Sequence, residues 1–372
     1  MSRTFKAFSM NPKVHVPPQF PGAVHPGTSH PSKPSGSKWI GPVWVPIAAI
    51  WALMLLIRHK LYDWGILPSK RGALPTLVVG NVELGGTGKT PHVLDLAQRL
   101  QDMVGEDSVG VLSRGYGRTS KGFQWASQAK RWQDVGDEPW MMQRRLPNLH
   151  VAVCANRLHG LAQMASERPQ LQLVVLDDGM QHRALQADLT IGLKARSAPA
   201  KPWQWTKVVP AGTFRDLPAR MDRCDLIVDT TGNDKSPHLK SKVCPNRPFN
   251  PSASERLTAP ALLVTGIARP ERATQSALDM GVDLVGCAHY PDHHAFKTSD
   301  VSHWIEWMKA QNMSALLTTS KDAVRLEGMM PPEWAEALWV LPMNVQWEEE
   351  ARLQESLESW VQALPSLQQR MD

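Results

Sequence analysis

Residues 77–91 read Leu-Val-Val-Gly-Asn-Val-Glu-Leu-Gly-Gly-Thr-Gly-Lys-Thr-Pro. A short apolar run is followed by a glycine-rich loop that ends in Gly-Lys-Thr. This order is typical of a buried strand, a phosphate-binding loop and the first turn of a helix. The stretch therefore predicts an α/β fold with a nucleotide site at the end of this strand.

The chemistry of phosphate binding explains the residue types in the loop. Glycines let the backbone curl so that successive N–H groups and the helix N-terminus point at one anion. Lys89 is expected to reach the β- and γ-phosphates, and the Thr90 hydroxyl is expected to bind Mg²⁺. The cofactor-binding residues predicted here are Gly85, Gly86, Thr87, Gly88, Lys89 and Thr90. Glu83 stands where the strict pattern has glycine.

A second apolar run, residues 171–176, ends in Asp177-Asp178-Gly179-Met180-Gln181-His182. Ligands of parallel sheets gather at the carboxyl ends of the strands, so an acid pair there can meet the metal held by Thr90. Acids at strand ends also serve as turn residues. The pairing with a Gly-Lys-Thr loop favours a metal site.

Apolar runs alternate with helical stretches along most of the chain, which predicts βαβ units and a mainly parallel sheet. We expect a P-loop domain over 61–230, a proline-rich linker over 231–259 and a smaller α/β domain over 260–372 that closes the cleft. The strands expected are Leu77–Gly80, Val109–Ser113, His150–Cys154, Leu173–Asp177, Leu189–Leu193, Leu226–Asp229, Ala261–Gly266, Val282–Ala288, Ala315–Thr319 and Leu338–Leu341. Helices are expected around 270–280, 298–312 and 348–362.

The net charge of +6 is concentrated at the N-terminus. Residues 1–38 carry five Lys and Arg and no acid, are rich in Pro, Ser and Gly, and are expected to be a disordered tail. Such a tail beside an apolar segment fits anionic lipid head groups better than nucleic acid, and we expect no nucleic-acid partner. The four scattered cysteines fit a reducing compartment.

Residues 39–57 lack a formal charge. As a helix they span roughly 28 Å, close to the hydrocarbon thickness of a bilayer. Three tryptophans within this segment favour the membrane–water interface. The alternative to a membrane helix is a buried core helix. We expect a membrane helix over 39–60, with an orientation that the flanking basic residues do not decide.

Three further motifs carry polar side chains. Leu112–Arg118 reads LSRGYGR and can bind phosphate or sugar or be a surface loop; Gly136–Pro139 reads GDEP, where capping is the usual reason for an acid. His289–His294 reads HYPDHH and resembles a metal cluster, but it lacks a second pair of ligands at familiar spacing.

With these motifs in one order, the chain resembles the tetraacyldisaccharide 4′-kinases of lipid A biosynthesis over about residues 39–345. The resemblance also rests on Ala155-Asn156-Arg157, PAGTFRDLP at 210–218, TGIARPER at 265–272 and TTSKDAVRL at 318–326. It implies a P-loop α/β domain, a smaller α/β domain and an N-terminal membrane segment. The implied reaction moves the γ-phosphoryl group of ATP, with Mg²⁺, to the 4′-hydroxyl of an acylated glucosamine disaccharide 1-phosphate at the cytoplasmic face of the bacterial inner membrane.

The resemblance also implies residue roles. Lys89 and Thr90 serve ATP and Mg²⁺, and Asp178 and Gln181 complete the metal site with Glu138 close by. Asp137 and His293 act together on the acceptor hydroxyl. Tyr116, Arg157 and Arg215 hold phosphate or sugar groups. We expect a monomer that contacts its lipid substrate and anionic inner-membrane lipids.

The chain departs from the family pattern at Glu83, usually Ser or Thr, and at Asp216, usually Glu. Two rival readings remain. One is a membrane-associated ATPase of the MinD/ParA kind, which has a lysine where this chain has Leu84. The other is a lipid-binding scaffold in which Glu83 has abolished nucleotide binding.

Overall fold

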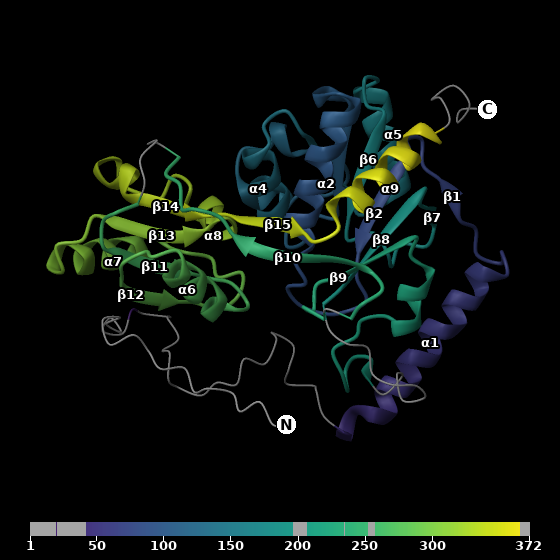
Figure 1. Cartoon of the computed structure of the whole chain (residues 1–372), viewed down its shortest axis with the longest axis horizontal. Coiled ribbons are helices and arrows are strands. Elements are labelled where there is room, and N and C mark those ends of the chain that lie inside the picture. Colours follow the sequence, from purple (N-terminus) through teal and green to yellow (C-terminus); the bar gives the residue numbers. More distant parts are fainter. Residues whose placement is uncertain (1–19, 21–41, 196–206, 234, 252–256, 365–372) are drawn as a thin grey trace. The chain divides into compact units, whose positions relative to one another are not determined.

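The computed structural model describes residue 20 and residues 42–195, 207–233, 235–251 and 257–364. They belong to two compact units: the smaller contains 245–343, and the larger contains the described residues of 33–244 and 344–372. Figure 1 shows both as sheets with helices packed against them. The fold is α/β with mainly parallel sheets, as predicted.

The larger unit is built on a nine-stranded sheet with the order β15-β10-β9-β8-β2-β6-β3-β5-β4 (Figure 1). The pairs from β10 to β5 are parallel, whereas β4 runs antiparallel to β5 and β15 runs antiparallel to β10 (Figure 1). The strands are β2 (Thr76–Gly80), β3 (Val109–Ser113), β4 (Gln124–Trp125), β5 (His150–Val153), β6 (Leu173–Asp177), β8 (Leu189–Lys194), β9 (Leu226–Asp229), β10 (Leu239–Pro245) and β15 (Met343–Trp347). A separate short pair joins β1 (Lys70–Arg71) and β7 (Leu185–Gln186).

Helices pack against this sheet, and its central strands are therefore buried along their whole length. Leu161 and Met164 of α5 (Arg157–Glu167) pack with Val78 and Leu112 in one cluster. The remaining elements of the unit are η2 (Pro42–Trp44), α1 (Val45–Asp63), α2 (Lys89–Val104), η3 (Glu106–Ser108), η4 (Ala126–Gln128), α3 (Trp132–Val135), α4 (Asp137–Arg145), α5 (Arg157–Glu167), η6 (Pro218–Arg223) and α9 (Glu350–Gln362).

The smaller unit has a four-stranded parallel sheet with the order β12-β11-β13-β14. Its two faces pack into separate apolar clusters, one around Trp304 and one around Leu263. The elements are β11 (Ala261–Thr265), α6 (Pro270–Asp279), β12 (Leu284–His289), α7 (Thr298–Ala310), β13 (Ala315–Thr319), α8 (Ser320–Leu326), η7 (Pro332–Ala337) and β14 (Leu338–Leu341).

The expected domain boundaries need correction. The expected linker 231–259 contributes β10 to the larger sheet, and β15 and α9 return to that unit although they were assigned to the smaller domain. The reason lies in their contacts with α2. His92 bonds the Ser241 hydroxyl of β10 at 2.8 Å, and the Trp347 indole donates to Asp95 at 2.8 Å.

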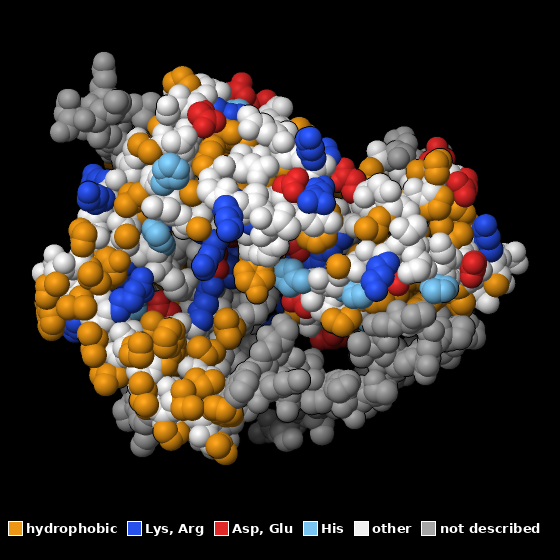
Figure 2. Space-filling model, turned by 180° about the vertical axis from the view of Figure 1, so that it is seen from behind, with side chains coloured by type: hydrophobic (Ala, Val, Ile, Leu, Met, Phe, Trp, Pro, Cys, Tyr) orange, Lys and Arg blue, Asp and Glu red, His pale blue; other side chains and the backbone are white. Residues whose placement is uncertain are grey.

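In the segment predicted as a helix over 39–60, residues 39–41 lie outside the described residues, and α1 begins at Val45 after η2 and extends to Asp63, past the predicted end. By length and composition it could cross a membrane, a test that a buried core helix or a signal sequence also passes. Within α1 only Ala48, Ala52, Leu55 and His59 are buried, and the exposed positions from Ile47 to Ile57 carry large apolar side chains. Figure 2 shows these hydrophobic side chains gathered at the lower left, where α1 lies.

Most of the predicted disordered tail lies outside the described residues. Phe20 is described, and the prediction of disorder is wrong for this residue. Phe20 is 7% exposed, and its ring lies 6.1 Å from the ring of Trp307. This aromatic contact places Phe20 in the core of the smaller unit.

His289 makes the stability of the smaller unit depend on pH. Burial lowers the pKa of His289 to about 4, and its Nδ1 lies 2.8 Å from the Thr265 hydroxyl. The unfolded chain binds a proton near pH 6.5, so stability is complete above that pH and is lost as the pH falls toward 4. When the pH falls from 7 to 5, we expect His289 to lower the free energy of unfolding by about 2 kcal/mol.

His289→Asn keeps a polar atom near Thr265 but cannot titrate. Urea unfolding of both proteins at pH 7 and pH 5 isolates the contribution, because all other titrating groups cancel in the double difference. An equal loss of stability in both proteins would show that His289 is not the cause.

Candidate functional site

The site lies at the carboxyl ends of β2, β3, β5 and β6, which are neighbours in the sheet. The loops after these strands contain the predicted P-loop, LSRGYGR, Ala155-Asn156-Arg157 and DDGMQH motifs. Because parallel strands end at one edge of the sheet, four motifs far apart in the sequence gather there. All four belong to the larger unit.

The P-loop has the predicted form. Strand β2 ends at Gly80 and α2 begins at Lys89, while Gly85 and Gly88 have φ values of +102° and +81°. Only glycine adopts such angles without strain. At Gly88 a side chain would also meet Val243 of β10 at 2.8 Å. The glycines are therefore required by the backbone, and they leave the loop N–H groups free to surround an anion.

Asn81 organises this loop, a role that sequence reasoning missed. Its side chain is fully buried, and its amide nitrogen donates to the Thr87 hydroxyl at 2.9 Å. The amide oxygen accepts from Lys89 Nζ at 3.2 Å and from Arg215 Nη2 at 2.5 Å. One amide thus holds the P-loop and both cations in place. The signal in the sequence was its position between Gly80 and the glycine-rich turn.

Asp178 is the carboxylate that two cations of the site contact. Arg215 donates to both of its carboxylate oxygens, one of them at 2.6 Å, and Lys89 Nζ lies 3.9 Å away. Burial alone would raise the pKa of Asp178, but the Arg215 hydrogen bonds and the Lys89 charge hold it below its usual value. Asp178 is therefore a carboxylate at neutral pH. Its φ of +58° turns the chain sharply at the strand end.

Asp177 has the opposite electrostatic environment. Burial, with the charges of Glu138 and Asp178 nearby, raises its pKa to about 7. One oxygen accepts from the Ser113 hydroxyl at 3.2 Å. The other, Oδ1, is buried and has no hydrogen-bond partner among the described residues. A buried oxygen of this kind can accept a cation or a bound water.

The residues present fit a magnesium ion. Thr90 lies in the first turn of α2 and Glu138 in the first turn of α4, while Asp177 is the last residue of β6 and Asp178 follows it. Gln181 donates its amide nitrogen to the Asn81 carbonyl at 2.9 Å, which directs its hydrogen bonding toward the P-loop. The described residues contain no group of three or more His, Cys, Asp or Glu suited to a metal by themselves. Mg²⁺ commonly uses one or two carboxylates together with substrate phosphates, so this sparse set suits it.

The predicted substrate-binding residues have different surroundings. Tyr116 is 76% exposed at the sheet edge. Arg157 is buried and donates to the carbonyls of Cys154 and Asp177, so it braces the ends of β5 and β6. Arg215 contacts Asp178 and Asn81.

The proposed catalytic pair is divided between the two units. Asp137 is buried at the first residue of α4, where its carboxylate accepts the Glu138 N–H at 2.9 Å. His293 belongs to the smaller unit, has φ +60°, and has Nε2 3.2 Å from Lys321 Nζ. Their joint action stays a prediction.

The histidines of HYPDHH do not converge. His289 bonds Thr265, His294 stacks on Tyr290 with ring centroids 4.6 Å apart, and His293 approaches Lys321. Three different partners mean that this motif does not form a metal cluster.

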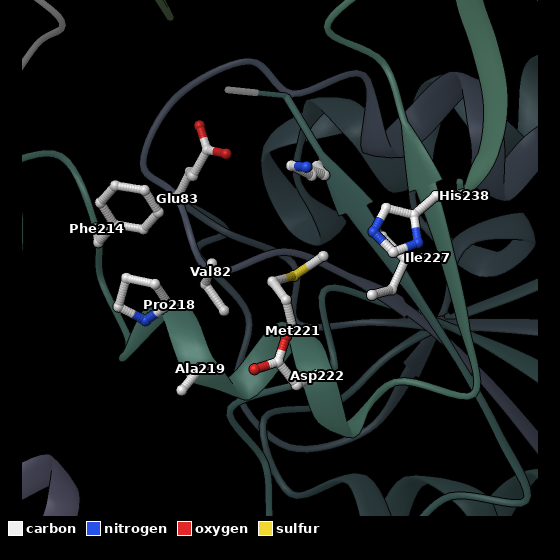
Figure 3. Close-up of a pocket in the computed structure, with 10 residues that line it drawn as sticks. Val82, Glu83, Phe214, Pro218, Ala219, Met221, Asp222, Ile227 and His238 are labelled. Carbon is white, nitrogen blue, oxygen red and sulfur yellow. The ribbon is translucent and has the colours of Figure 1, made fainter. Parts of the chain in front are cut away.

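Glu83 borders a separate cavity that encloses about 120 Å³ next to the P-loop. Figure 3 shows Glu83 and Phe214 at one end of this cavity and His238 at the other. The Glu83 side chain is 3% exposed. Lys194 also lines the cavity, so a cation shares the space with this carboxylate.

Comparison with known proteins identifies the family. The family model described as tetraacyldisaccharide-1-P 4′-kinase matches residues 41–362. The chain belongs to this family. It is 32% identical over 336 residues to the tetraacyldisaccharide 4′-kinase of Porphyromonas gingivalis, covering 81% of this chain and 91% of that protein. The enzyme of the same name from Bacteroides thetaiotaomicron is 29% identical over 340 residues, covering 81% and 87%.

A solved structure agrees with this assignment. LpxK from Aquifex aeolicus, crystallised in complex with ATP, superposes with a TM-score of 0.68 at 26% identity, covering 86% of this chain and 98% of that one. The fold predicted from the sequence is therefore the fold of a family member with bound ATP.

Lys89 should dominate turnover in this tetraacyldisaccharide 4′-kinase family member. We expect Lys89→Ala to lower kcat by several orders of magnitude, because positioning and charge neutralisation supply most of the catalysis in phosphoryl transfer. Circular dichroism and thermal unfolding check that the variant is folded. Lys130→Ala, at an exposed position of the same unit, serves as the control. Near-normal turnover of folded Lys89→Ala would eliminate the P-loop assignment.

Proposed function

We propose that this protein transfers the γ-phosphoryl group of ATP to the 4′-hydroxyl of a tetraacylated glucosamine disaccharide 1-phosphate, forming lipid IVA. The observation that carries the proposal is the contact of Asp178, directly after β6, with Lys89 and Arg215 of the neighbouring loops in a chain of this family. A phosphate-binding loop and an acid pair on adjacent parallel strands are the parts that P-loop phosphotransferases use.

Thr90, Asp178 and Gln181 are the residues that would hold Mg²⁺, with Glu138 close by. When bound, the ion neutralises charge on the β- and γ-phosphates. Lys89 adds a second positive charge at the γ-phosphate. Arg215 donates to Asp178, the carboxylate that we also assign to the ion. We therefore propose that Arg215 binds phosphate oxygens that the ion does not contact.

The acceptor hydroxyl needs a group that takes its proton as the bond to phosphorus forms. We assign this role to Asp137, and we assign His293 to orienting that carboxylate or sharing the proton. Lys321 supports His293 from the same unit, because its Nζ lies 3.2 Å from the His293 Nε2. Tyr116 is the exposed residue best placed to stack on or bond a sugar.

A lipid substrate requires the protein to contact a membrane, and α1 has an exposed apolar surface that suits such contact. Its exposed side carries Ile50, Leu53, Met54 and Leu56, each about half exposed. An apolar stripe of this size on a helix is unfavourable in water and favourable in lipid. We propose that the protein acts as a monomer at the cytoplasmic face of the bacterial inner membrane, where anionic lipids contact its basic N-terminus.

Acceptor dependence separates this function from its rivals. We expect ATP consumption to require the acylated disaccharide 1-phosphate and the product to carry a new 4′-phosphate, measured in detergent with γ-labelled ATP. Hydrolysis without acceptor would instead indicate an ATPase of the MinD/ParA kind. No ATP consumption and no ATP binding would indicate a scaffold.

The catalytic pair predicts non-additive losses. If Asp137 and His293 work as a unit, then Asp137→Asn, His293→Ala and the double variant should show similar decreases in kcat. ATP affinity should change little, because neither residue is assigned to the nucleotide. Multiplicative losses would contradict the pair, and a large loss of ATP affinity in Asp137→Asn would move Asp137 into the metal site.

A further inference from the structure

Helix α1 is fixed to the larger unit by one narrow stripe. Its buried residues Ala48, Ala52, Leu55 and His59 recur at intervals of three or four positions, so they lie on one face of the helix. Ala52 and Leu55 pack in a cluster with Val82, Phe214 and Met221. Val82 follows Asn81, and Phe214 precedes Arg215, so the helix rests against the two chain segments that carry the phosphate site.

The polar end of the stripe is the His59–Asp216 pair. His59 Nε2 lies 2.7 Å from Asp216 Oδ1, and the two side chains are 5% and 1% exposed. The same oxygen accepts the Leu217 N–H at 2.8 Å. Asp216 directly follows Arg215, whose guanidinium holds Asp178. A buried carboxylate needs its partners, because removing one leaves charge without compensation.

The backbone makes this link short. The N–H groups of Arg215 and Asp216 both donate to the Val82 carbonyl, at 2.9 and 3.4 Å. The Arg215 side chain then returns to Asn81, the residue before Val82. The direction of the Arg215 side chain therefore depends on the position of the Arg215-Asp216 backbone. His59 is the α1 residue that contacts this dipeptide, through Asp216.

A second connection reaches the metal loop. Arg58 donates to the Gln181 carbonyl at 3.0 Å, and Arg183 donates to the His59 carbonyl and to Asp63, both at 2.8 Å. The 181–183 part of the loop that follows Asp178 therefore contacts α1. The last two turns of the helix contact the active-site loops, while its first turns carry most of the exposed apolar surface.

We propose that His59 is a positioning residue for the Mg·ATP site: through Asp216 it orients Arg215 toward Asp178, so that α1 is part of the nucleotide site as well as a membrane anchor. The inference rests on the proposed roles of Asp178, Lys89 and Arg215. It gives the membrane helix a function that is measurable without any lipid substrate.

The test measures equilibrium binding of a non-hydrolysable ATP analogue with Mg²⁺ in detergent. We expect His59→Leu to weaken binding by about tenfold, the size of losing one hydrogen bond to a buried charge. His59→Gln, whose amide can donate where Nε2 does, should recover most of this loss. His59→Asn keeps polarity but is too short for that position, and it should bind as weakly as His59→Leu.

Two further measurements separate positioning from general destabilisation. Asp216→Asn should weaken binding, and adding His59→Leu to it should cause little further loss, because both changes break one link. Met54→Ala, on the exposed side of α1, is the matched control and should bind as the unchanged protein does. Membrane sedimentation should be the same for the His59 variants and the unchanged protein, because their exposed apolar side is intact.

Variants of the site residues and variants of His59 test the nucleotide site and the role of His59 separately. Lys89→Ala and Asp178→Asn test the site itself, and binding unaffected by either would remove the basis of both. If these two weaken binding while folded His59→Leu and His59→Asn bind normally, the role of His59 is overturned alone. Equal weakening by His59→Gln and His59→Leu would also overturn it, because a donor at that position would then be irrelevant.

Discussion

The nucleotide site depends on how the carboxylates at the end of β6 are compensated. Asp177 and Asp178 are adjacent and largely buried, with Glu138 close enough to affect the pKa of Asp177. Such a group of like charges is unfavourable unless cations or protons balance it. In this structure Arg215 and Lys89 balance Asp178, and the raised pKa of Asp177 leaves it partly protonated near neutral pH. A magnesium nucleotide would bring a cation to the carboxylates and phosphate groups to Lys89 and Arg215.

Asn81 and α1 determine where those cations lie. Asn81 receives both Lys89 and Arg215 on one amide oxygen, so it keeps two like charges together at the phosphate position. Helix α1 acts from the other side of Arg215 through the buried His59–Asp216 pair. The same helix exposes apolar residues along its length. The helix therefore packs on one side against the segments that carry the P-loop and Arg215, and its other side exposes large apolar side chains.

The sequence predicted the central strands within two residues at either end, because each is a short apolar run that ends at a turn or polar residue. Three outer strands of the larger sheet, β4, β10 and β15, were missed. In β10, Lys240 and Lys242 alternate with Ser241 and Val243, a pattern typical of a half-buried strand, and the surrounding prolines resembled a linker. Helix α9 was found, but its buried Leu353 and Leu357 do not say which sheet they pack on.

The candidate site was predicted where a local motif carries it. The P-loop glycines, Lys89 and the acid pair occur in recognisable patterns, whereas Asn81 acquires its role only from partners brought close by folding. Arg215 lies 37 positions from Asp178, and His59 lies 157 positions from Asp216. No periodicity or spacing connects residues so far apart, and only the packing of α1 and β2 brings them together.

The most direct test of this account is the Mg²⁺ dependence of ATP binding in the unchanged protein and in Asp178→Asn. The account predicts that Mg²⁺ strengthens ATP binding in the unchanged protein, because the ion compensates both the carboxylates and the phosphates. In Asp178→Asn this dependence should largely disappear while binding without the ion is retained, because Lys89 and Arg215 remain and the competing carboxylate is gone. An equal strengthening by Mg²⁺ in both proteins would contradict the central role of Asp178.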